Sequence, residues 1–240
     1  MFSRIFRNHK KNRDIKQWRF DKGVTKIFEG HIRKHTPFYE EMHRMIAELS
    51  DWFLRDSSIV YDLGTSTGEG IRRIYERHSD KKLKFVAVDK SEEMVKKAKN
   101  NLSQVPNVEF HVHDLNKSFT IKNASMVLSV LTLQFLEPDS RPRLLKEVFD
   151  GLKFGGAFIL VEKVLGNTPK FDEIWTDLHH DMKRRKGLND EEITIKRQSL
   201  RGILLPYSFS KNIQLINEAG FQEVDIFFKW YSWIGIVATR

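Results

Sequence analysis

The feature that most constrains this chain is the stretch from residue 59 to residue 70, which reads IVYDLGTSTGEG. An apolar run of strand-forming residues ends at Asp62, a loop with three glycines follows, and Ile71 begins a pattern typical of a helix. Glycine lacks a Cβ atom, so such a loop can turn sharply and lie close to a ligand. The start of the helix adds backbone N–H groups that have no intrahelical partner. The order strand, glycine loop, helix therefore predicts a nucleotide-binding crevice in an open α/β sheet.

The spacing of the glycines narrows the kind of ligand. A dinucleotide fingerprint would need glycine where Ser66 stands, and no Lys-Ser or Lys-Thr pair follows Gly70 as a P-loop requires. The pattern D-x-G-x-x-x-G instead resembles motif I of class I S-adenosylmethionine (SAM) methyltransferases, with Ser66 in place of the middle glycine. The alternative is a tight turn with a purely structural purpose.

Composition excludes several other classes of protein. The 240 residues are 40% hydrophobic and include 18 Phe, which is enough for the core of one large domain. Because cysteine is absent, disulfides, thiolate metal sites and cysteine nucleophiles are excluded, and no G-x-S-x-G elbow indicates a serine hydrolase. The nine histidines include no H-E-x-x-H pattern, so we expect no metal site. No apolar run approaches the roughly 20 residues of a membrane span, and we expect a cytoplasmic protein without a membrane partner.

The charge of the chain is strongly basic, with a formal net charge of +9. This favours anionic partners such as acidic metabolites, although a generally basic surface is the simpler explanation. Six basic residues and one acid, Asp14, lie within the first 16 residues. Because this segment lacks a long apolar core, we expect residues 1–17 to form a basic arm rather than a targeting peptide. No RNA-binding signature is present, so direct nucleic-acid binding is not favoured; the arm is where it would occur.

Hydrophobic periodicity predicts the order of the elements. Helices are expected over residues 20–30 and 31–54, the latter with a break and restart at Pro37-Phe38-Tyr39, and over 71–78, 143–152 and 213–219, with a further helix capped by Ser91. Strands are expected over 59–62, 84–88, 108–112, 124–131, 157–161, 222–228 and 231–239. Alternating strands and helices predict an α/β, Rossmann-like class I methyltransferase fold, with a mostly parallel seven-stranded sheet and an antiparallel C-terminal hairpin. We expect residues 18–240 to form one domain, with an N-terminal helical cap over 18–56 and a helical insert over 165–207. Gly155 and Gly156 are expected to end the helix that precedes the fifth strand.

Acidic residues follow three successive predicted strands. Asp62, Asp89 and Asp114 each stand where a strand ends, and the carboxyl ends of parallel strands form the ligand crevice of such a sheet. An ionised carboxylate only accepts hydrogen bonds, so Asp89 suits a pair of ribose hydroxyls, and Asp114 with Leu115 suits an adenine ring. Asp62 could hold amides of the loop or, through water, a ligand ammonium. Any one of these acids could instead be an ordinary cap or turn residue.

Over residues 18–238 the chain resembles the carboxy-SAM synthase family, which makes the carboxymethyl donor for wobble-uridine modification in bacterial tRNA. The resemblance covers several blocks in order: Trp18-x-Phe20-Asp21, Pro37-x-Tyr39, Val60-Tyr61-Asp62-Leu63-Gly64, residues 123–127 (NASMV), residues 132–138 (TLQFLEP), Gly155-Gly156-Ala157, His179-His180-Asp181-x-Lys183-Arg184 and Lys196-Arg197. The serine of the glycine loop, Ser66, is also matched. One departure is Val130, where the family has asparagine.

The resemblance implies SAM or carboxy-SAM as the cofactor and a role for each matched site residue. Gly64, Thr65 and Ser66 would hold the methionyl part, Asp89 and Lys90 the ribose, and Asp114 and Leu115 the adenine. Tyr39 would approach the sulfonium, and Arg197 would pair with the extra carboxylate, for which a guanidinium fork is suited. On this basis Tyr39 and Arg197 are the catalytic candidates, and Val130 lines the ligand site.

The resemblance further implies a reaction of SAM with prephenate, an anionic small molecule, and a homodimer. Two alternatives stay open. Because valine cannot hydrogen-bond as asparagine can, Val130 is compatible with an ordinary methyl transfer to a small acceptor. The other alternative is a SAM-binding or RNA-associated protein without catalysis.

Overall fold

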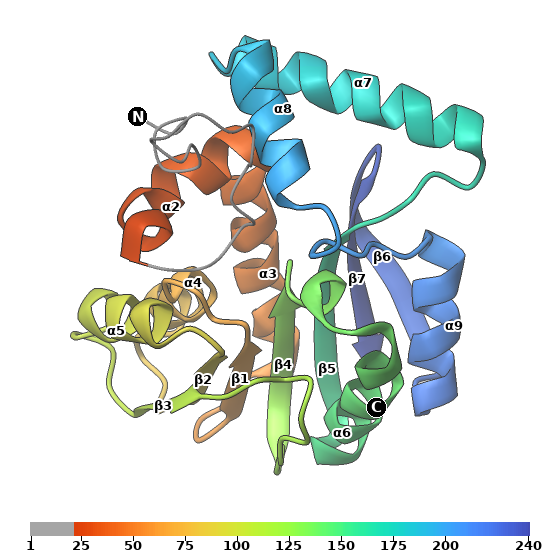
Figure 1. Cartoon of the computed structure of the whole chain (residues 1–240). Coiled ribbons are helices and arrows are strands. Elements are labelled where there is room, and N and C mark those ends of the chain that lie inside the picture. The colour runs from red at the N-terminus through yellow and green to blue at the C-terminus, as the bar shows by residue number, and fades with distance from the viewer. Residues whose placement is uncertain (1–21) are drawn as a thin grey trace.

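A computed structural model describes residues 22–240 and contains a seven-stranded sheet in the order β3-β2-β1-β4-β5-β7-β6 (Figure 1). The strands are β1 Ile59–Leu63, β2 Lys84–Asp89, β3 Val108–Val112, β4 Ala124–Val130, β5 Leu152–Lys163, β6 Glu223–Trp230 and β7 Trp233–Thr239. Strands β1 to β5 pair in parallel, whereas β7 is antiparallel to both β5 and β6. The strand order reverses between β1 and β4, and this reversal is where open α/β sheets bind ligands.

Helices cover both faces of this sheet. They are α2 Lys22–His35, α3 Tyr39–Phe53, α4 Glu69–Arg77, α5 Glu92–Asn101, α6 Arg141–Gly151, α7 Pro169–Arg185, α8 Asp190–Ser199 and α9 Phe209–Ala219, with short 3-10 turns at Leu133–Phe135 and Pro138–Ser140. Apolar side chains of α3 and α4 join one buried cluster with alternate residues of the central strands, and those of α6 and α9 join a second cluster on the other face. Helices α7 and α8 lie across the upper end of the sheet in Figure 1, beside α2 and α3.

The period-2 pattern of the strands explains this division of the core. In β1 the side chains of Val60 and Tyr61 belong to different clusters because successive residues of a strand point to opposite faces. Strand β4 lies in the middle of the sheet and is buried over its first six residues, whereas the edge strands β3 and β6 are largely half-exposed or exposed. The fold class predicted from the sequence, including the antiparallel C-terminal pair, is therefore confirmed.

The helix ends follow local capping chemistry. The Ser91 side chain accepts a hydrogen bond from the Met94 backbone N–H, as expected for the start of α5. Asn189 and Glu192 form a reciprocal capping box at the start of α8, and Gly220 ends α9 with a φ of 121°. Each of these caps involves residues close in sequence, so the order of elements could be predicted from the sequence.

Two predicted boundaries were wrong. The first two helices do not divide at Gly30, because α2 continues to His35. The break falls instead next to the interruption predicted at Pro37-Phe38-Tyr39, where Phe38 takes a left-handed φ of 49° before α3 begins at Tyr39. Gly155 and Gly156 do not end a helix either, because β5 already begins at Leu152. The backbone of Arg240 accepts a hydrogen bond from Gly155 N and donates one to Gly156 O, and these long-range bonds hold the glycines in the strand.

The predicted basic arm, residues 1–17, lies outside the described residues, as do Trp18 to Asp21. Between residues 22 and 240, no helix combines the length and the apolar character that crossing a membrane would require.

Candidate active site

A cavity of about 640 Å³ lies at the carboxyl ends of β1, β2, β4 and β5 and is covered by α2, α3, α7 and α8. All the site residues predicted from the sequence line it, namely Tyr39, Asp62, Gly64, Thr65, Ser66, Asp89, Lys90, Asp114, Leu115, Val130 and Arg197. Residues far apart along the chain thus line the same cavity. The parallel sheet brings the strand-end residues together, and the helices before and after it supply Tyr39 and Arg197.

The glycine loop after β1 is held against β2 by its backbone. The N–H groups of Gly64 and Thr65 both donate to the carbonyl oxygen of Val88, at 2.7 and 2.9 Å. Gly64 has a φ of 82° and Ser66 a φ of 51°, so both adopt the left-handed conformation. Serine can stand in place of glycine here at an energetic cost of about 1–2 kcal/mol, because the left-handed conformation crowds its Cβ.

Asp62 lies beneath this loop with 3% of its surface exposed. Its Oδ2 accepts a hydrogen bond from the Thr65 hydroxyl at 2.8 Å. Burial raises the pKa of Asp62 to about 7 despite that hydrogen bond, and the nearby Asp89 adds to the shift. A cationic ligand group in the cavity would favour the ionised carboxylate, so Asp62 suits a ligand ammonium.

Asp89 connects the glycine loop to the end of β2. Its Oδ2 accepts the Ser66 N–H and its Oδ1 accepts the Ser91 N–H, both at 2.9 Å. Burial nevertheless raises the pKa of Asp89, although these backbone hydrogen bonds oppose the rise. The Lys90 backbone also hydrogen-bonds Asp89. A carboxylate has about four acceptor sites, so Asp89 retains capacity for a ribose hydroxyl.

The predicted adenine end contains an ion pair. Lys90 Nζ lies 2.6 Å from Asp114 Oδ2, and Asp114 Oδ1 accepts the Asn116 N–H at 3.1 Å. Partial burial raises the pKa of Asp114, but the hydrogen bonds from Lys90 and Asn116 outweigh it and leave the pKa below its usual value. The neighbouring Leu115 is buried and adds an apolar wall. Charged and apolar side chains thus line this end of the cavity together.

Tyr39 begins α3 and packs edge-on against His43, with 4.6 Å between the ring centroids. His43 lines the cavity as well, and neither of its ring nitrogens has a hydrogen-bond partner among residues 22–240. Burial lowers the pKa of His43 to about 4, so its imidazole is neutral at physiological pH. Tyr39 and His43 therefore present an uncharged aromatic wall to the ligand.

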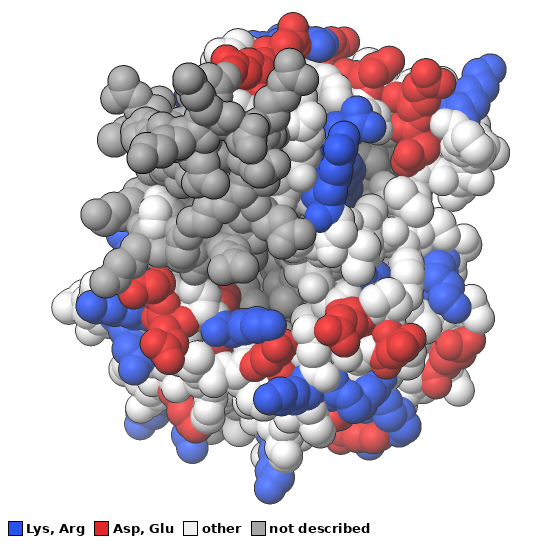
Figure 2. All heavy atoms as spheres, in the orientation of Figure 1, with Lys and Arg blue, Asp and Glu red and all other residues white. Residues whose placement is uncertain are grey.

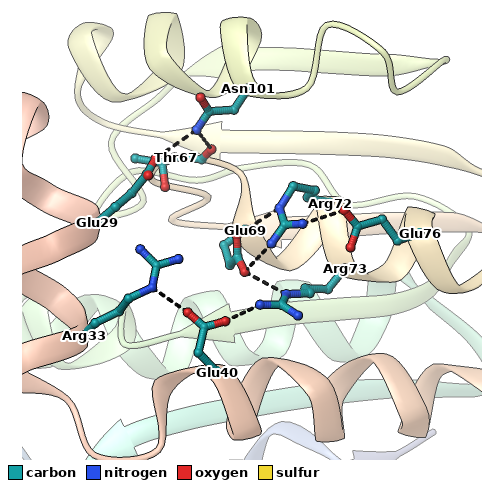
Figure 3. Close-up of polar contacts among 9 residues, drawn as sticks. All are labelled: Glu29, Arg33, Glu40, Thr67, Glu69, Arg72, Arg73, Glu76 and Asn101. Carbon is teal, nitrogen blue, oxygen red and sulfur yellow. Dashed lines mark hydrogen bonds and ion pairs between the residues drawn. The ribbon is translucent and has the colours of Figure 1, made fainter.

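An ion-pair network connects the helical cap to α4, the helix that follows the glycine loop (Figure 3). Glu40 at the start of α3 pairs with Arg33 of α2 and with Arg73 of α4, and Arg73 also bonds Glu69 at 2.8 Å. Glu69 lines the cavity and begins α4 directly after the glycine loop. These contacts hold α2, α3 and α4 in one arrangement around the site.

A second contact in Figure 3 reaches the glycine loop from α5. The Asn101 side-chain amide donates to the Thr67 carbonyl oxygen at 2.9 Å and to Glu29 Oε1 at 3.2 Å. Because Glu29 belongs to α2, this one amide connects the loop to both α5 and α2.

The half of the cavity that faces β5, α7 and α8 is basic, and apart from Arg197 none of its residues was predicted as a site residue. It is lined by Lys163 of β5, His31 and His35 of α2, His179 and Lys183 of α7, and Lys196 of α8. Burial and the neighbouring lysines lower the pKa of His31 and of His179 to about 2. His179 and Lys183 are four residues apart and hence share one face of α7; this spacing, together with their place in a block that matches the family, could have marked them. Within residues 22–240, no three His, Cys, Asp or Glu side chains gather in a way that could hold a metal ion.

Arg197 stands at the rim of the basic half. It is exposed and lines both the main cavity and a second hollow of about 280 Å³ between α7 and α8. Figure 2 shows Lys and Arg atoms beside α8 on this face of the molecule. Val130, the last residue of β4, is half-buried, and its side chain contributes no hydrogen-bonding group to the cavity.

The sheet order, the glycine loop and the acids at the strand ends define a SAM-dependent transferase of the class I methyltransferase type. A family model described as a methyltransferase domain matches residues 60–156. A carbon methyltransferase, CurJ, has the same fold with a TM-score of 0.67 at 15% identity over 92% of this chain and 59% of that one. Human N-acetylserotonin methyltransferase in complex with SAM has a TM-score of 0.61 at 16% identity over 92% of this chain and 56% of that one.

Relatives with closer sequences define the family. The carboxy-S-adenosyl-L-methionine synthase of Methylococcus capsulatus is 38% identical over 224 residues, which cover 92% of this chain and 93% of the relative. The synthase of Staphylococcus epidermidis is 36% identical over 228 residues, covering 93% of this chain and 97% of the relative. The chain belongs to the carboxy-S-adenosyl-L-methionine synthase family, and the resemblance seen in the sequence is confirmed.

Proposed function

We propose that this protein converts SAM and prephenate into carboxy-SAM and phenylpyruvate. Prephenate loses carbon dioxide and hydroxide, the hydroxide removes a proton from the methyl group of SAM as water, and that methyl carbon bonds the carbon dioxide. The charge division of the cavity is the observation that carries this proposal. Asp62, Asp89 and Asp114 line one half, whereas the other is lined by the cationic side chains Lys163, Lys183, Lys196 and Arg197, so a cationic adenosyl compound and an anionic acid could bind together.

In this proposal each predicted site residue has a place in the binding of SAM or carboxy-SAM. The loop of Gly64, Thr65 and Ser66 takes the methionyl part above Asp62. Asp89 and Lys90 take the ribose, and Asp114 and Leu115 take the adenine. Tyr39 faces the sulfonium, Val130 lines the space beside it, and Arg197 pairs with the carboxylate of the product. The chain's contribution to the rate is positioning and charge stabilisation rather than covalent catalysis.

The proposal is tested by incubating the purified protein with SAM and prephenate and analysing the products by mass spectrometry. We expect carboxy-SAM and phenylpyruvate to form in equal amounts. Adenosylhomocysteine together with a methylated acceptor would instead indicate ordinary methyl transfer, which the valine at position 130 makes the second candidate. No heat on titration with SAM, carboxy-SAM or adenosylhomocysteine would refute both.

Arg197 gives a sharper test of the product. A bidentate, charge-assisted pair contributes about 1.5–3 kcal/mol, so Arg197→Ala should weaken carboxy-SAM binding by about 10- to 150-fold. Binding of SAM, which lacks that carboxylate, should stay unchanged. Arg185→Ala is the matched control because Arg185 is exposed at the end of α7 and does not line the cavity. Equal losses for SAM and carboxy-SAM would remove Arg197 from this role.

The remaining parts of the proposal concern the cellular setting. The chain is proposed to act in the cytoplasm as a homodimer, with residues 18–240 as a single domain, and its product to serve wobble-uridine modification of tRNA. Sedimentation at several concentrations tests the dimer. Deletion of residues 1–17 tests the arm. We expect the shortened protein to fold as before, and we expect neither form to bind tRNA at low salt.

A further inference from the structure

Two lysines face the cavity from different elements of its basic half. Lys163 is the last residue of β5, and Lys183 lies near the end of α7 with only 7% of its surface exposed. Neither side-chain nitrogen makes an ion pair or a hydrogen bond with any residue between 22 and 240. Buried lysines are normally paired, and the nearest acid that acts on Lys163 is Asp172, which makes no ion pair with it among residues 22–240. Two cavity-facing lysines without a directly paired acid in this range point to a ligand that supplies the negative charge.

The electrostatics of this half agree with an anionic ligand. Burial, followed by the charges of Lys163 and Arg197, lowers the pKa of Lys183 to about 7. Burial also lowers the pKa of Lys163, which Asp172 partly opposes and Arg197 reinforces. Positive charges around this cavity therefore disfavour one another, and negative charge placed between them would favour the protonated lysines and offset their desolvation.

We propose that Lys163 and Lys183 bind the two carboxylates of the anionic cosubstrate and thereby make the enzyme specific for dicarboxylic acids. The inference rests on the proposed function, because it concerns the second substrate of that reaction. The two ammonium groups come from a strand end and from a helix that covers the cavity, so an acid bound by both would be held at two points. An acid with one carboxylate could satisfy only one lysine and would leave the other buried without a counter-ion.

The position of the lysines also separates the two substrates. The acids proposed to bind SAM lie at or just beyond the ends of β1, β2 and β3, whereas Lys163 ends β5 and Lys183 belongs to α7. A change at either lysine should therefore alter the affinity for the acid and leave the affinity for SAM unchanged. A residue with only a structural role would shift both affinities together or neither.

The experiment measures steady-state kinetics for Lys183→Met and Lys163→Met, with Lys170→Met as the control on the exposed side of α7. Losing a charged hydrogen-bonding partner costs about 1.5–3 kcal/mol, so KM for prephenate should rise about 10- to 150-fold in each of the first two variants. KM for SAM should stay within about twofold, a change of less than 0.5 kcal/mol. Lys183→Arg should recover part of the loss, because it retains the charge.

Direct titration separates this inference from the proposed function. The protein loaded with adenosylhomocysteine is titrated with prephenate, with a simple dicarboxylate, with a monocarboxylate of similar size and with inorganic phosphate. Tighter binding of the dicarboxylates, lost in Lys183→Met and kept in Lys170→Met, supports the inference even if no carboxy-SAM forms. Equal binding of mono- and dicarboxylates, preference for phosphate, or unchanged binding in both lysine variants would overturn it. Thermal unfolding confirms that the variants are folded, and replacing a buried charge with methionine is expected to be tolerated.

Discussion

Replacing Gly64 with alanine should destabilise the protein for two separable reasons. Gly64 follows β1 with a φ of 82°, where a side chain strains the backbone. A Cβ atom at this position would also lie 2.1 Å from Thr132 Oγ1 and 2.5 Å from Thr132 Cγ2. Gly187 provides a matched control, because it has the same φ of 82° and no atom within 4 Å of its would-be Cβ.

The expected magnitudes follow from these two terms. A left-handed conformation costs an L-residue about 1–2 kcal/mol. Alanine offsets about 0.4–1 kcal/mol of this cost, because it lowers the conformational entropy of the unfolded chain. Gly187→Ala should therefore lower the free energy of unfolding by at most about 1.5 kcal/mol. Overpacking adds about 1–3 kcal/mol, so Gly64→Ala should lose roughly 1–4.5 kcal/mol.

Urea denaturation followed by circular dichroism measures both losses, and a double-mutant cycle isolates the contact. Thr132→Ala removes the two atoms that a Cβ at Gly64 would meet most closely, so it should recover about 1–2 kcal/mol in the Gly64→Ala background. Adenosylhomocysteine binding should weaken at least tenfold, or about 1.4 kcal/mol, in Gly64→Ala but not in Gly187→Ala. Equal losses at Gly64 and Gly187, or no recovery with Thr132→Ala, would refute the steric argument.

Two further predictions concern pH and the helical cap. Because burial raises the pKa of Asp62 to about 7 and a bound ammonium favours its ionised form, SAM affinity should fall toward tenfold per pH unit below pH 7. Calorimetry should show this dependence in the native protein and not in Asp62→Asn; a parallel dependence in the variant would assign it to another group. Arg73→Met, which breaks the pairs with Glu40 and Glu69, should cost about 1 kcal/mol of unfolding free energy, whereas Arg44→Met, at an exposed pair with Glu48, should cost less than about 0.5 kcal/mol. Equal melting temperatures for these two variants would show that the network adds no stability.

The sequence by itself determined the order of the elements and most of the cofactor half of the cavity. Strand and helix periods are local properties, and so are caps such as Ser91 and Asn189. The carboxyl ends of parallel strands meet at one edge of the sheet, so the positions of Asp62, Asp89 and Asp114 along the chain were enough to place them at one crevice. Tyr39 and Arg197 came from the family resemblance rather than from periodicity.

Only the tertiary structure decided which distant segments face each other. Gly155 and Gly156 lie in β5 because they form backbone hydrogen bonds with Arg240. The sequence around the two glycines does not indicate this distant partner. The basic half of the cavity combines α2, β5, α7 and α8, and the periodicity of a helix marks its apolar face without stating what that face meets. Periodicity therefore gives Lys163 and Lys183 no site role, and the family resemblance marked Lys183 only as part of a matching block. Their burial, and the charge repulsion that follows from it, exists only once the helices close over the sheet.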